Sequence, residues 1–266
     1  MDKTQLISVI QKSPFLRCFE NSPEIIFKSL ENLPRKDGWQ TKPIEESGER
    51  LLAITGYENG HATRIHPRIF PHPIYFENGI VGALPVIYVR ESVARALLDY
   101  INLLPDGYGI IAYDGYRPIS VQQALFDDAY KKFGEETEVF VSKPSLNPSC
   151  PSTHNTGGAI DFQICASKNG CKLDYGCGFD DFRDAAHLDY FEKKDDLDDM
   201  EIEAMLNARV AANLARSVGF DYYWGEKWHF DKDNQWDSRA AVSKYGSCDL
   251  NDIRPNPNAT IMELLK

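Results

Sequence analysis

Capping residues, turn residues and apolar residues at helical spacing predict four helices along the chain. The clearest apolar repeat ends before a Pro-Asp-Gly turn that begins at Pro105. A capping serine precedes the first and the third helix (Ser22 and Ser120), and a glycine closes the third and the fourth (Gly134 and Gly219). The four predicted helices comprise residues 25–33, 91–104, 121–133 and 199–217.

Six shorter segments are predicted to be strands. The clearest, at residues 157–164, places three large apolar side chains on one face and Asp161 with its polar neighbours on the other. The Asn169-Gly170 pair that follows is typical of a hairpin turn. The other predicted strands are residues 50–56, 83–89, 109–116, 220–224 and 227–231. Between residues 32 and 76 the pattern gives little guidance.

The order of these elements indicates the fold class. Helices alternate with hairpin-connected strands, and there is no series of βαβ units. We therefore expect an α+β fold with a central, mainly antiparallel sheet and flanking helices. A chain of 266 residues often folds as one unit with insertions.

Composition and charge exclude several classes of protein. Hydrophobic residues make up 42% of the chain, which argues against intrinsic disorder. With 40 acidic and 29 basic side chains the formal net charge is −11, so a nucleic-acid partner is not expected. No run of about 18 apolar residues is present, and the first residues lack the pattern of an export signal. We therefore expect no membrane association and a cytoplasmic location.

The six cysteines allow two interpretations. Their spacing matches none of the usual CxxC zinc knuckles, and a chain of this size does not need disulfides. We favour free thiols in a reducing cytoplasm. A disulfide between Cys165 and Cys171, or between Cys171 and Cys177, is the alternative.

Two pairs of residues indicate a candidate zinc site. His154 lies in a turn-rich segment seven residues before Asp161, and Glu226 lies three residues before His229. Catalytic zinc commonly has three protein ligands and leaves its fourth position to water. A histidine and a carboxylate from one segment, with a second histidine from far along the chain, satisfy this requirement.

Regular strand geometry would place the members of each pair on opposite faces. Gly157 and Gly158 can break the first strand so that His154 returns over its end, and Gly225 can bend the chain before Glu226. Each of these residues also has an interpretation that does not involve a metal. A single histidine is most often a surface or core residue, Asp161 can be exposed on its strand, and Glu226 can form a surface pair with Lys227.

At Asp114-Gly115-Tyr116-Arg117-Pro118 the sequence resembles the zinc D-alanyl-D-alanine dipeptidases, which cleave the free dipeptide. Four blocks resemble that family in the same order, and together they run from about Leu84 to Phe230. These blocks are DGYRP, S-x-H-x-x-G-x-A-x-D from Ser152 to Asp161, the segment around GCGFDDF, and E-x-W-H-F from Glu226 to Phe230.

The resemblance implies a role for each matching residue. His154, Asp161 and His229 would bind one Zn²⁺ per chain at the edge of the sheet. Glu226 would be the general base and acid, and Arg117 would stabilise the tetrahedral intermediate. Ser152 and Asp180 would lie near the substrate, with Asp180 holding the ammonium group of the dipeptide. Arg117 also has a structural alternative, in which it ties the strand–helix turn together through Asp114.

The sequence departs from the family at three points. Lys227 stands where the family commonly has the first of two tryptophans, and Cys177-Gly178 stands where it commonly has Thr-Pro. The chain is also longer at both ends than the usual member. We therefore expect a single zinc peptidase domain over residues 1–266, with an N-terminal extension of about 1–78 and a C-terminal extension of about 235–266.

The predicted function is zinc-dependent hydrolysis of a small D-amino-acid dipeptide, most directly D-Ala-D-Ala. A D,D- or L,D-carboxypeptidase acting on peptidoglycan stem peptides is the alternative, and it would require a more open cleft. A catalytically silent zinc-binding protein ranks lower because Glu226 is present. The acidic excess fits a substrate with an ammonium group, since residues 180–203 hold eleven acidic and three basic residues beside the predicted pocket.

Overall fold

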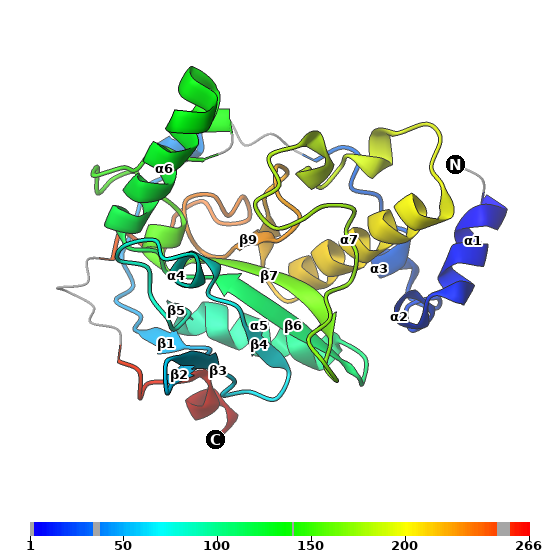
Figure 1. Ribbon diagram of the computed structural model, residues 1–266, viewed down its shortest axis with the longest axis horizontal. Helices are drawn as coiled ribbons and strands as arrows, with labels where there is room; N and C mark the ends of the chain where they lie inside the picture. Colours follow the sequence, from blue (N-terminus) through cyan, green and yellow to red (C-terminus); the bar gives the residue numbers. More distant parts are fainter. Residues whose placement is uncertain (1–2, 34–37, 140, 249–255) are drawn as a thin grey trace.

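The computed structural model describes residues 3–33, 38–139, 141–248 and 256–266, and a five-stranded sheet lies at its centre (Figure 1). The strands follow the order β4–β6–β7–β9–β8, with β4 parallel to β6 and all other pairs antiparallel. This confirms the predicted α+β class with a mainly antiparallel sheet. The strands comprise β4 (Ile69–Pro71), β6 (Tyr108–Asp114), β7 (Ala159–Ala166), β8 (Asp221–Tyr222) and β9 (His229–Asp231).

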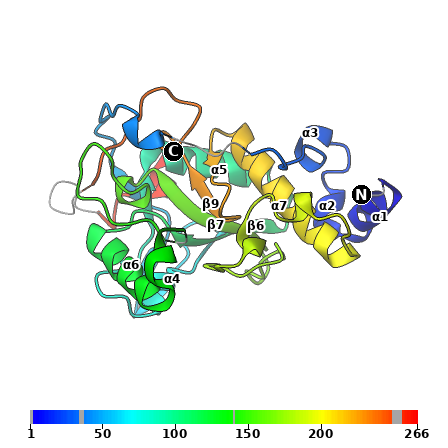
Figure 2. The same ribbon diagram turned by 90° about the horizontal axis from the view of Figure 1, so that it is seen from above.

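Two long helices, α5 (Glu91–Leu103) and α7 (Asp199–Ser217), cover one face of this sheet (Figure 2). Phe162 of β7 points toward them and packs edge-on against Tyr100, with ring centroids 4.9 Å apart. The predicted alternation of β7 is therefore correct, because its large apolar residues face the helices. The opposite face is also buried, since Asp161 is only 2% exposed. The interpretation of Asp161 as a solvent-exposed strand residue is wrong.

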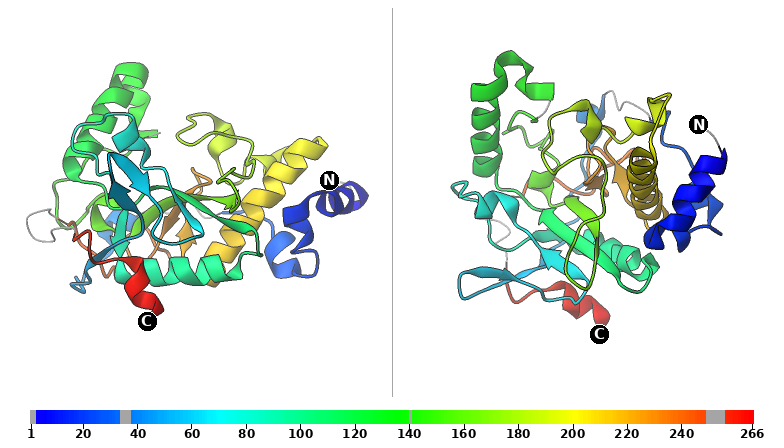
Figure 3. Two further views of the ribbon diagram at one scale, coloured as in Figure 1. Left: turned by 60° about the horizontal axis from the view of Figure 1, so that its bottom comes forward. Right: turned by 45° about the vertical axis from the view of Figure 1, so that its right-hand side comes forward.

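The remaining elements surround the sheet. Helices α1, α2 and α3 lie beside α7, and α6 projects from the other end of the molecule (Figure 3). The helices are α1 (Lys3–Lys12), α2 (Pro14–Arg17), α3 (Pro23–Ile26), α4 (Ile74–Glu77) and α6 (Ile119–Phe133). Two small antiparallel pairs join β1 (Leu51–Ala53) to β5 (Tyr88–Arg90) and β2 (Gly56–Glu58) to β3 (His61–Thr63). The 3-10 turns are η1 (Trp39–Thr41), η2 (Gly134–Val139), η3 (His154–Thr156), η4 (Asp184–Ala186), η5 (Phe191–Lys193) and η6 (Ile261–Leu265).

Two of the predicted helices differ from the structure. The first one ends at Ile26, because the carbonyls of Ile25 and Lys28 accept hydrogen bonds from Asn213 of α7. Ser120 does not cap α6. The helix begins at Ile119, two residues before the predicted start, and its N-cap residue is Pro118. The other two helices and the end of α6 at Gly134 are confirmed.

Four of the predicted strands are shorter than expected by two residues or more, and the last two of them are reduced to Asp221–Tyr222 and His229–Asp231. Only Tyr88–Arg90 of the segment near residue 85 pairs with another strand, consistent with Pro85 lacking an N–H donor. The segment at residues 50–56 contributes β1 and the first residue of β2. The hairpin turn at Asn169-Gly170 is confirmed by the φ of +69° at Gly170, although its second arm pairs only at Lys172.

Two further findings concern the chain as a whole. All six cysteines lie within the described residues and all are unpaired, so neither alternative disulfide is formed. In the part of the chain that the structure describes, no helix has the length and apolar character needed to cross a bilayer.

Candidate active site

Strand pairing brings three acidic or histidine side chains together on the sheet face opposite α5 and α7. Asp161 of β7 lies directly across from His229 of β9 and also pairs with Asp114 at the end of β6. Residues at paired positions of neighbouring strands have side chains on the same face and about 5 Å apart. The sheet register therefore places Asp161 between Asp114 and His229.

His154 reaches the same point from a 3-10 turn just before β7. The turn spans His154–Thr156 and ends at Gly157, which adopts a φ of +71° and accepts no other residue type without strain. The chain thus reverses before β7 begins, as predicted from the two glycines. The main chain of the turn is also held, because Arg117 N–H donates to the His154 carbonyl at 3.1 Å.

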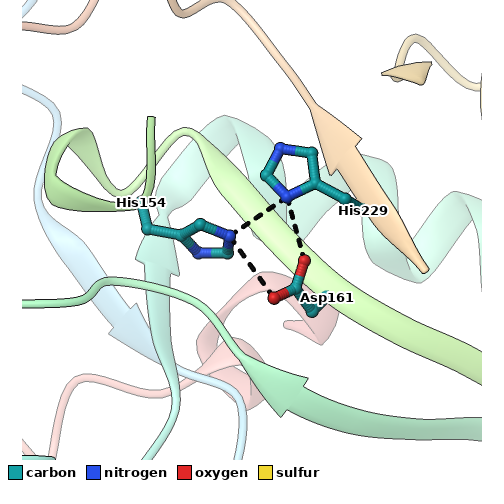
Figure 4. A group of neighbouring side chains, drawn as sticks. All are labelled: His154, Asp161 and His229. Carbon is teal, nitrogen blue, oxygen red and sulfur yellow. Dashed lines mark hydrogen bonds and ion pairs between the residues drawn. The ribbon is translucent and has the colours of Figure 1, made fainter. Parts of the chain in front are cut away.

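His154, Asp161 and His229 converge on one point (Figure 4). His154 Nε2 lies 3.1 Å from His229 Nδ1 and 3.4 Å from Asp161 Oδ2, and His229 Nδ1 lies 3.0 Å from Asp161 Oδ1. All three side chains are buried. The sequence-predicted ligand set is therefore assembled by the fold, from two strands and one turn.

Each histidine has an oxygen atom close to its outer nitrogen, which favours a proton at that position. His154 Nδ1 lies 2.7 Å from the Gly115 carbonyl, which can only accept, so the proton of His154 resides on Nδ1. His229 Nε2 lies 3.2 Å from Oδ2 of the fully buried Asp231. With protons on these outer nitrogens, His154 Nε2 and His229 Nδ1 both direct lone pairs at the shared point.

This arrangement fits a metal ion. With both outer nitrogens protonated, two nitrogen lone pairs and a carboxylate face one another at 3.0–3.4 Å, and a bound cation removes the repulsion among them. Burial opposes a charge on His229, but the carboxylates of Asp231 and Asp161 raise its pKa well above the usual value. Burial likewise opposes ionisation of Asp161, but the two histidines hold its pKa below its usual value. The site thus favours a positive charge, and two histidines with one carboxylate are ligands typical of zinc.

Glu226 lies at the edge of this cluster. The turn through Gly225 between β8 and β9 places Glu226 Oε2 3.8 Å from His229 Nδ1, and both residues line the same cavity, as the sequence predicts. Burial raises the pKa of Glu226 to about 8, and the negative charges of Asp161 and Asp180 act in the same direction. A cation bound at the ligands opposes this effect and favours the carboxylate form.

Arg117 is buried beside the same cluster. Its Nε donates to Asp114 Oδ2 at 2.8 Å and its Nη1 to Gln122 Oε1 at 2.7 Å, so the expected pairing with Asp114 is present. Among the residues that the structure describes, its Nη2 makes only longer contacts, at 3.4 Å to Tyr75 Oη and 3.8 Å to Asp161 Oδ2. Burial lowers the pKa of Arg117, but Tyr75 and the nearby carboxylates raise it above the usual value, so the guanidinium stays charged.

Ser152 and Asp180 line the same cavity and come from separate segments of the chain. Ser152 is 8% exposed, and its buried Oγ has no hydrogen-bond partner among the described residues. A buried hydroxyl of this kind is typical of a group that awaits a ligand or water. Asp180 has a φ of +52° and lies 3.3 Å from Tyr75 Oη, and burial raises its pKa to about 6.

Sequence analysis missed two residues of this site. Tyr75 lies between Arg117 and Asp180 and contacts both, but it comes from the stretch in which the sequence pattern gave little guidance. Asp231 could have been found, because it is two residues after His229 and therefore shares its face of the strand.

The cluster lies in a cavity of about 800 Å³. Figure 1 shows α6 on one side of this site and the loops of residues 171–198 on the other, and both segments contribute lining residues. Aromatic side chains form part of the wall, with the Trp39 and Trp236 ring centroids 4.9 Å apart. The volume is within the range of sites for drug-sized ligands, ~300–1,000 Å³.

Comparison with known proteins decides the family. The protein-family model described as D-ala-D-ala dipeptidase, Peptidase M15, matches residues 83–245, a range that includes every predicted site residue. The chain belongs to this family. M15 peptidases are metallopeptidases, and this family member has three residues that can hold a metal ion.

Individual relatives of this M15 peptidase agree with the family match. The D-alanyl-D-alanine dipeptidase of Synechocystis is 26% identical over 73% of this chain and 85% of the relative. That of Enterococcus faecalis is 25% identical over 59% of this chain and 75% of the relative. Among solved structures, the LdcB LD-carboxypeptidase aligns at 21% identity over 67% of this chain and 68% of its own, with a TM-score of 0.34.

The two substitutions by which this M15 peptidase departs from the family pattern, at Lys227 and at Cys177-Gly178, lie outside the cavity lining. The Lys227 ammonium points out of the cavity and donates to the carbonyls of Tyr175 and Ala185. Cys177 and Gly178 belong to the loop between those two carbonyls and do not line the cavity. Neither departure places an unusual side chain in the site.

Proposed function

We propose that this chain is a zinc-dependent dipeptidase that hydrolyses a small dipeptide of D-amino acids, most directly D-Ala-D-Ala. The observation that carries the proposal is the buried cluster of His154, Asp161 and His229 with Glu226 beside it in one cavity. The family match and the names of both relatives support the substrate class.

His154 Nε2, His229 Nδ1 and one oxygen of Asp161 would hold the zinc ion. When bound, zinc lowers the pKa of a coordinated water to about 7 and polarises a carbonyl group. The outer partners of the histidines, the Gly115 carbonyl and the Asp231 carboxylate, keep the ligand nitrogens free of protons.

Glu226 and Arg117 would perform the proton transfer and stabilise the charge. As a carboxylate, Glu226 takes the proton of the attacking water and then delivers it to the leaving amine. Arg117 stays charged, and its Nη2 has only long contacts, so this N–H group can donate to the oxyanion that develops on the scissile carbonyl.

Ser152 and Asp180 would bind the substrate. The free hydroxyl of Ser152 supplies a hydrogen bond without giving one up. Asp180, which lines the same cavity, offers a carboxylate to the ammonium group of the dipeptide. Tyr75 fixes the position of this carboxylate through its contact with Oδ1.

The cavity volume favours a second candidate. About 800 Å³ is more than two alanine residues require, and a carboxypeptidase acting on peptidoglycan stem peptides needs a longer cleft. The test is to incubate the zinc-loaded protein with D-Ala-D-Ala, L-Ala-L-Ala and a pentapeptide that ends in D-Ala-D-Ala. The proposal expects D-alanine mainly from the first substrate, whereas cleavage of the pentapeptide alone would assign a carboxypeptidase.

We further propose that residues 1–266 form one peptidase domain that includes both extensions. Contacts between the extensions support this, since the chain near Ile44 pairs in parallel with Ser243. Both extensions also approach the turn that carries His154. Arg90, which is bonded to Glu46, donates to the Thr156 carbonyl at 2.8 Å, and Cys248 N–H donates to the Asn155 carbonyl at 2.9 Å.

A further inference from the structure

The loop that carries Asp180 is held at both ends by one lysine. Lys227 is 1% exposed, and its Nζ donates to the Tyr175 carbonyl at 2.8 Å and to the Ala185 carbonyl at 2.7 Å. These two carbonyls lie five residues on either side of Asp180. The ammonium group also lies 4.3 Å from the centroid of the Phe191 ring, which provides a cation–π contact.

The conformation of the loop needs such support. Asp180 has a φ of +52°, a left-handed conformation that costs free energy for a residue with a side chain. The middle of the loop is held by Phe179, which stacks on Tyr113 and packs against Trp228. The ring centroids lie 4.4 Å and 5.1 Å apart, respectively. The two ends are joined across Lys227, whose neighbour in the chain is Glu226.

We infer that Lys227 is a positioning residue that sets Asp180 opposite Glu226, and thereby determines how tightly the site binds the ammonium group of its substrate. Lys227 does not line the cavity, so it acts through the loop and not by contact with substrate. The inference rests on the proposed dipeptidase function, because it deepens the role given there to Asp180. It also accounts for a lysine where the family commonly has tryptophan.

The test compares Lys227→Met with the wild type on D-Ala-D-Ala. Methionine keeps the length of the side chain but leaves both carbonyls without a donor. We expect KM to rise about tenfold, kcat to change less than about threefold and zinc content to stay the same, because an interaction made equally in ground and transition states affects KM. Lys227→Arg, which keeps charge and donors, should restore most of the affinity.

Two controls separate positioning from a general structural effect. N-acetyl-D-Ala-D-Ala lacks the ammonium group, so its inhibition constant should be the same for Lys227→Met and the wild type. In Lys232→Met, a lysine bonded to the Gly219 carbonyl outside the cavity is removed, and KM should not change. If Lys227→Met does not fold, Lys227→Gln, which is uncharged and one bond shorter than lysine, is measured with the same substrates and should also raise KM.

The outcomes distinguish this inference from the function on which it rests. The double variant Lys227→Met/Asp180→Asn should have the KM of Asp180→Asn alone, because the lysine acts through that carboxylate. An unchanged KM in folded Lys227→Met, or in Lys227→Gln where the methionine variant does not fold, overturns the inference, and so does equal weakening of the N-acetylated ligand. A wild-type protein that does not hydrolyse the dipeptide overturns the proposed function instead.

Discussion

The two sides of the cleft are built in different ways. On the sheet side, Asp161 and His229 are neighbours in the strand register, and each histidine has a partner for its outer nitrogen. On the loop side, Asp180 is held through the two carbonyls that Lys227 bonds and the packing of Phe179. The reaction centre is therefore positioned by strand register, whereas Asp180 is positioned by hydrogen bonds and ring packing of its loop. Substitutions on the sheet side should affect metal and kcat, and those on the loop side should affect KM.

The largest effect is expected from His154→Ala. Removing one of three ligands should abolish stoichiometric zinc binding and lower kcat/KM at least about 10³-fold, because the metal supplies several kcal/mol of transition-state stabilisation. Metal analysis of the purified variant gives the direct measurement. The exposed His61 is the matched control, and His61→Ala should retain zinc and activity. Full zinc content in His154→Ala would contradict the ligand assignment.

Glu226→Gln should lower the rate of hydrolysis without loss of bound zinc. The amide keeps the size of the side chain but cannot accept a proton, so kcat should fall about 10²- to 10⁴-fold while zinc remains bound. Steady-state kinetics together with metal analysis test this on one preparation. Turnover close to that of the wild type would show that another group is the base.

Asp231→Asn tests the carboxylate that lies beside the outer nitrogen of His229. Loss of the charge that faces His229 Nε2 should weaken zinc binding about 10- to 100-fold, as is usual for partners of ligand histidines. Competition with a metal chelator measures the affinity of the protein without relying on activity. Asp195→Asn, at an exposed position, is the control and should have the affinity of the wild type.

The loop side should show a pH-dependent KM. Asp180 binds an ammonium group only when ionised, and burial raises its pKa to about 6. A cation at the metal ligands lowers this value, so KM should increase as the pH falls, at or below pH 6. Asp180→Asn should raise KM about 10- to 100-fold at pH 7 and remove this pH dependence. Zinc content measured at each pH shows whether loss of metal contributes to the change in KM. If KM of Asp180→Asn depends on pH as in the wild type, the role of Asp180 in ammonium binding is contradicted.

The convergence of His154, Asp161 and His229 could be predicted from the sequence, because they lie in short segments with clear local signals that also resemble the dipeptidase family. Gly157 marks the turn that returns His154, and alternation places Asp161 away from the apolar face of its strand. The contribution of Tyr75 could not be predicted, because it depends on packing between segments distant in the chain. The predicted length of the first helix was wrong for the same reason. Asn213 of α7 donates hydrogen bonds to the carbonyls that a longer α3 would use within the helix.

The length of the predicted strands shows the same limit. Residues 83–89 have the composition of a strand, but pairing is limited to Tyr88–Arg90, because Pro85 lacks an N–H donor and the partner β1 comprises only Leu51–Ala53. Local pattern thus determines which residues can form a strand, whereas the partner strand determines how many do.

Release of D-alanine from D-Ala-D-Ala tests the central claim most directly. We would follow it for the purified protein as isolated, after removal of metal with a chelator, and after addition of one equivalent of zinc per chain. The account predicts hydrolysis, its loss with the metal and its return with zinc. Hydrolysis that persists in the metal-free protein, or no hydrolysis in the zinc-loaded protein, would contradict it.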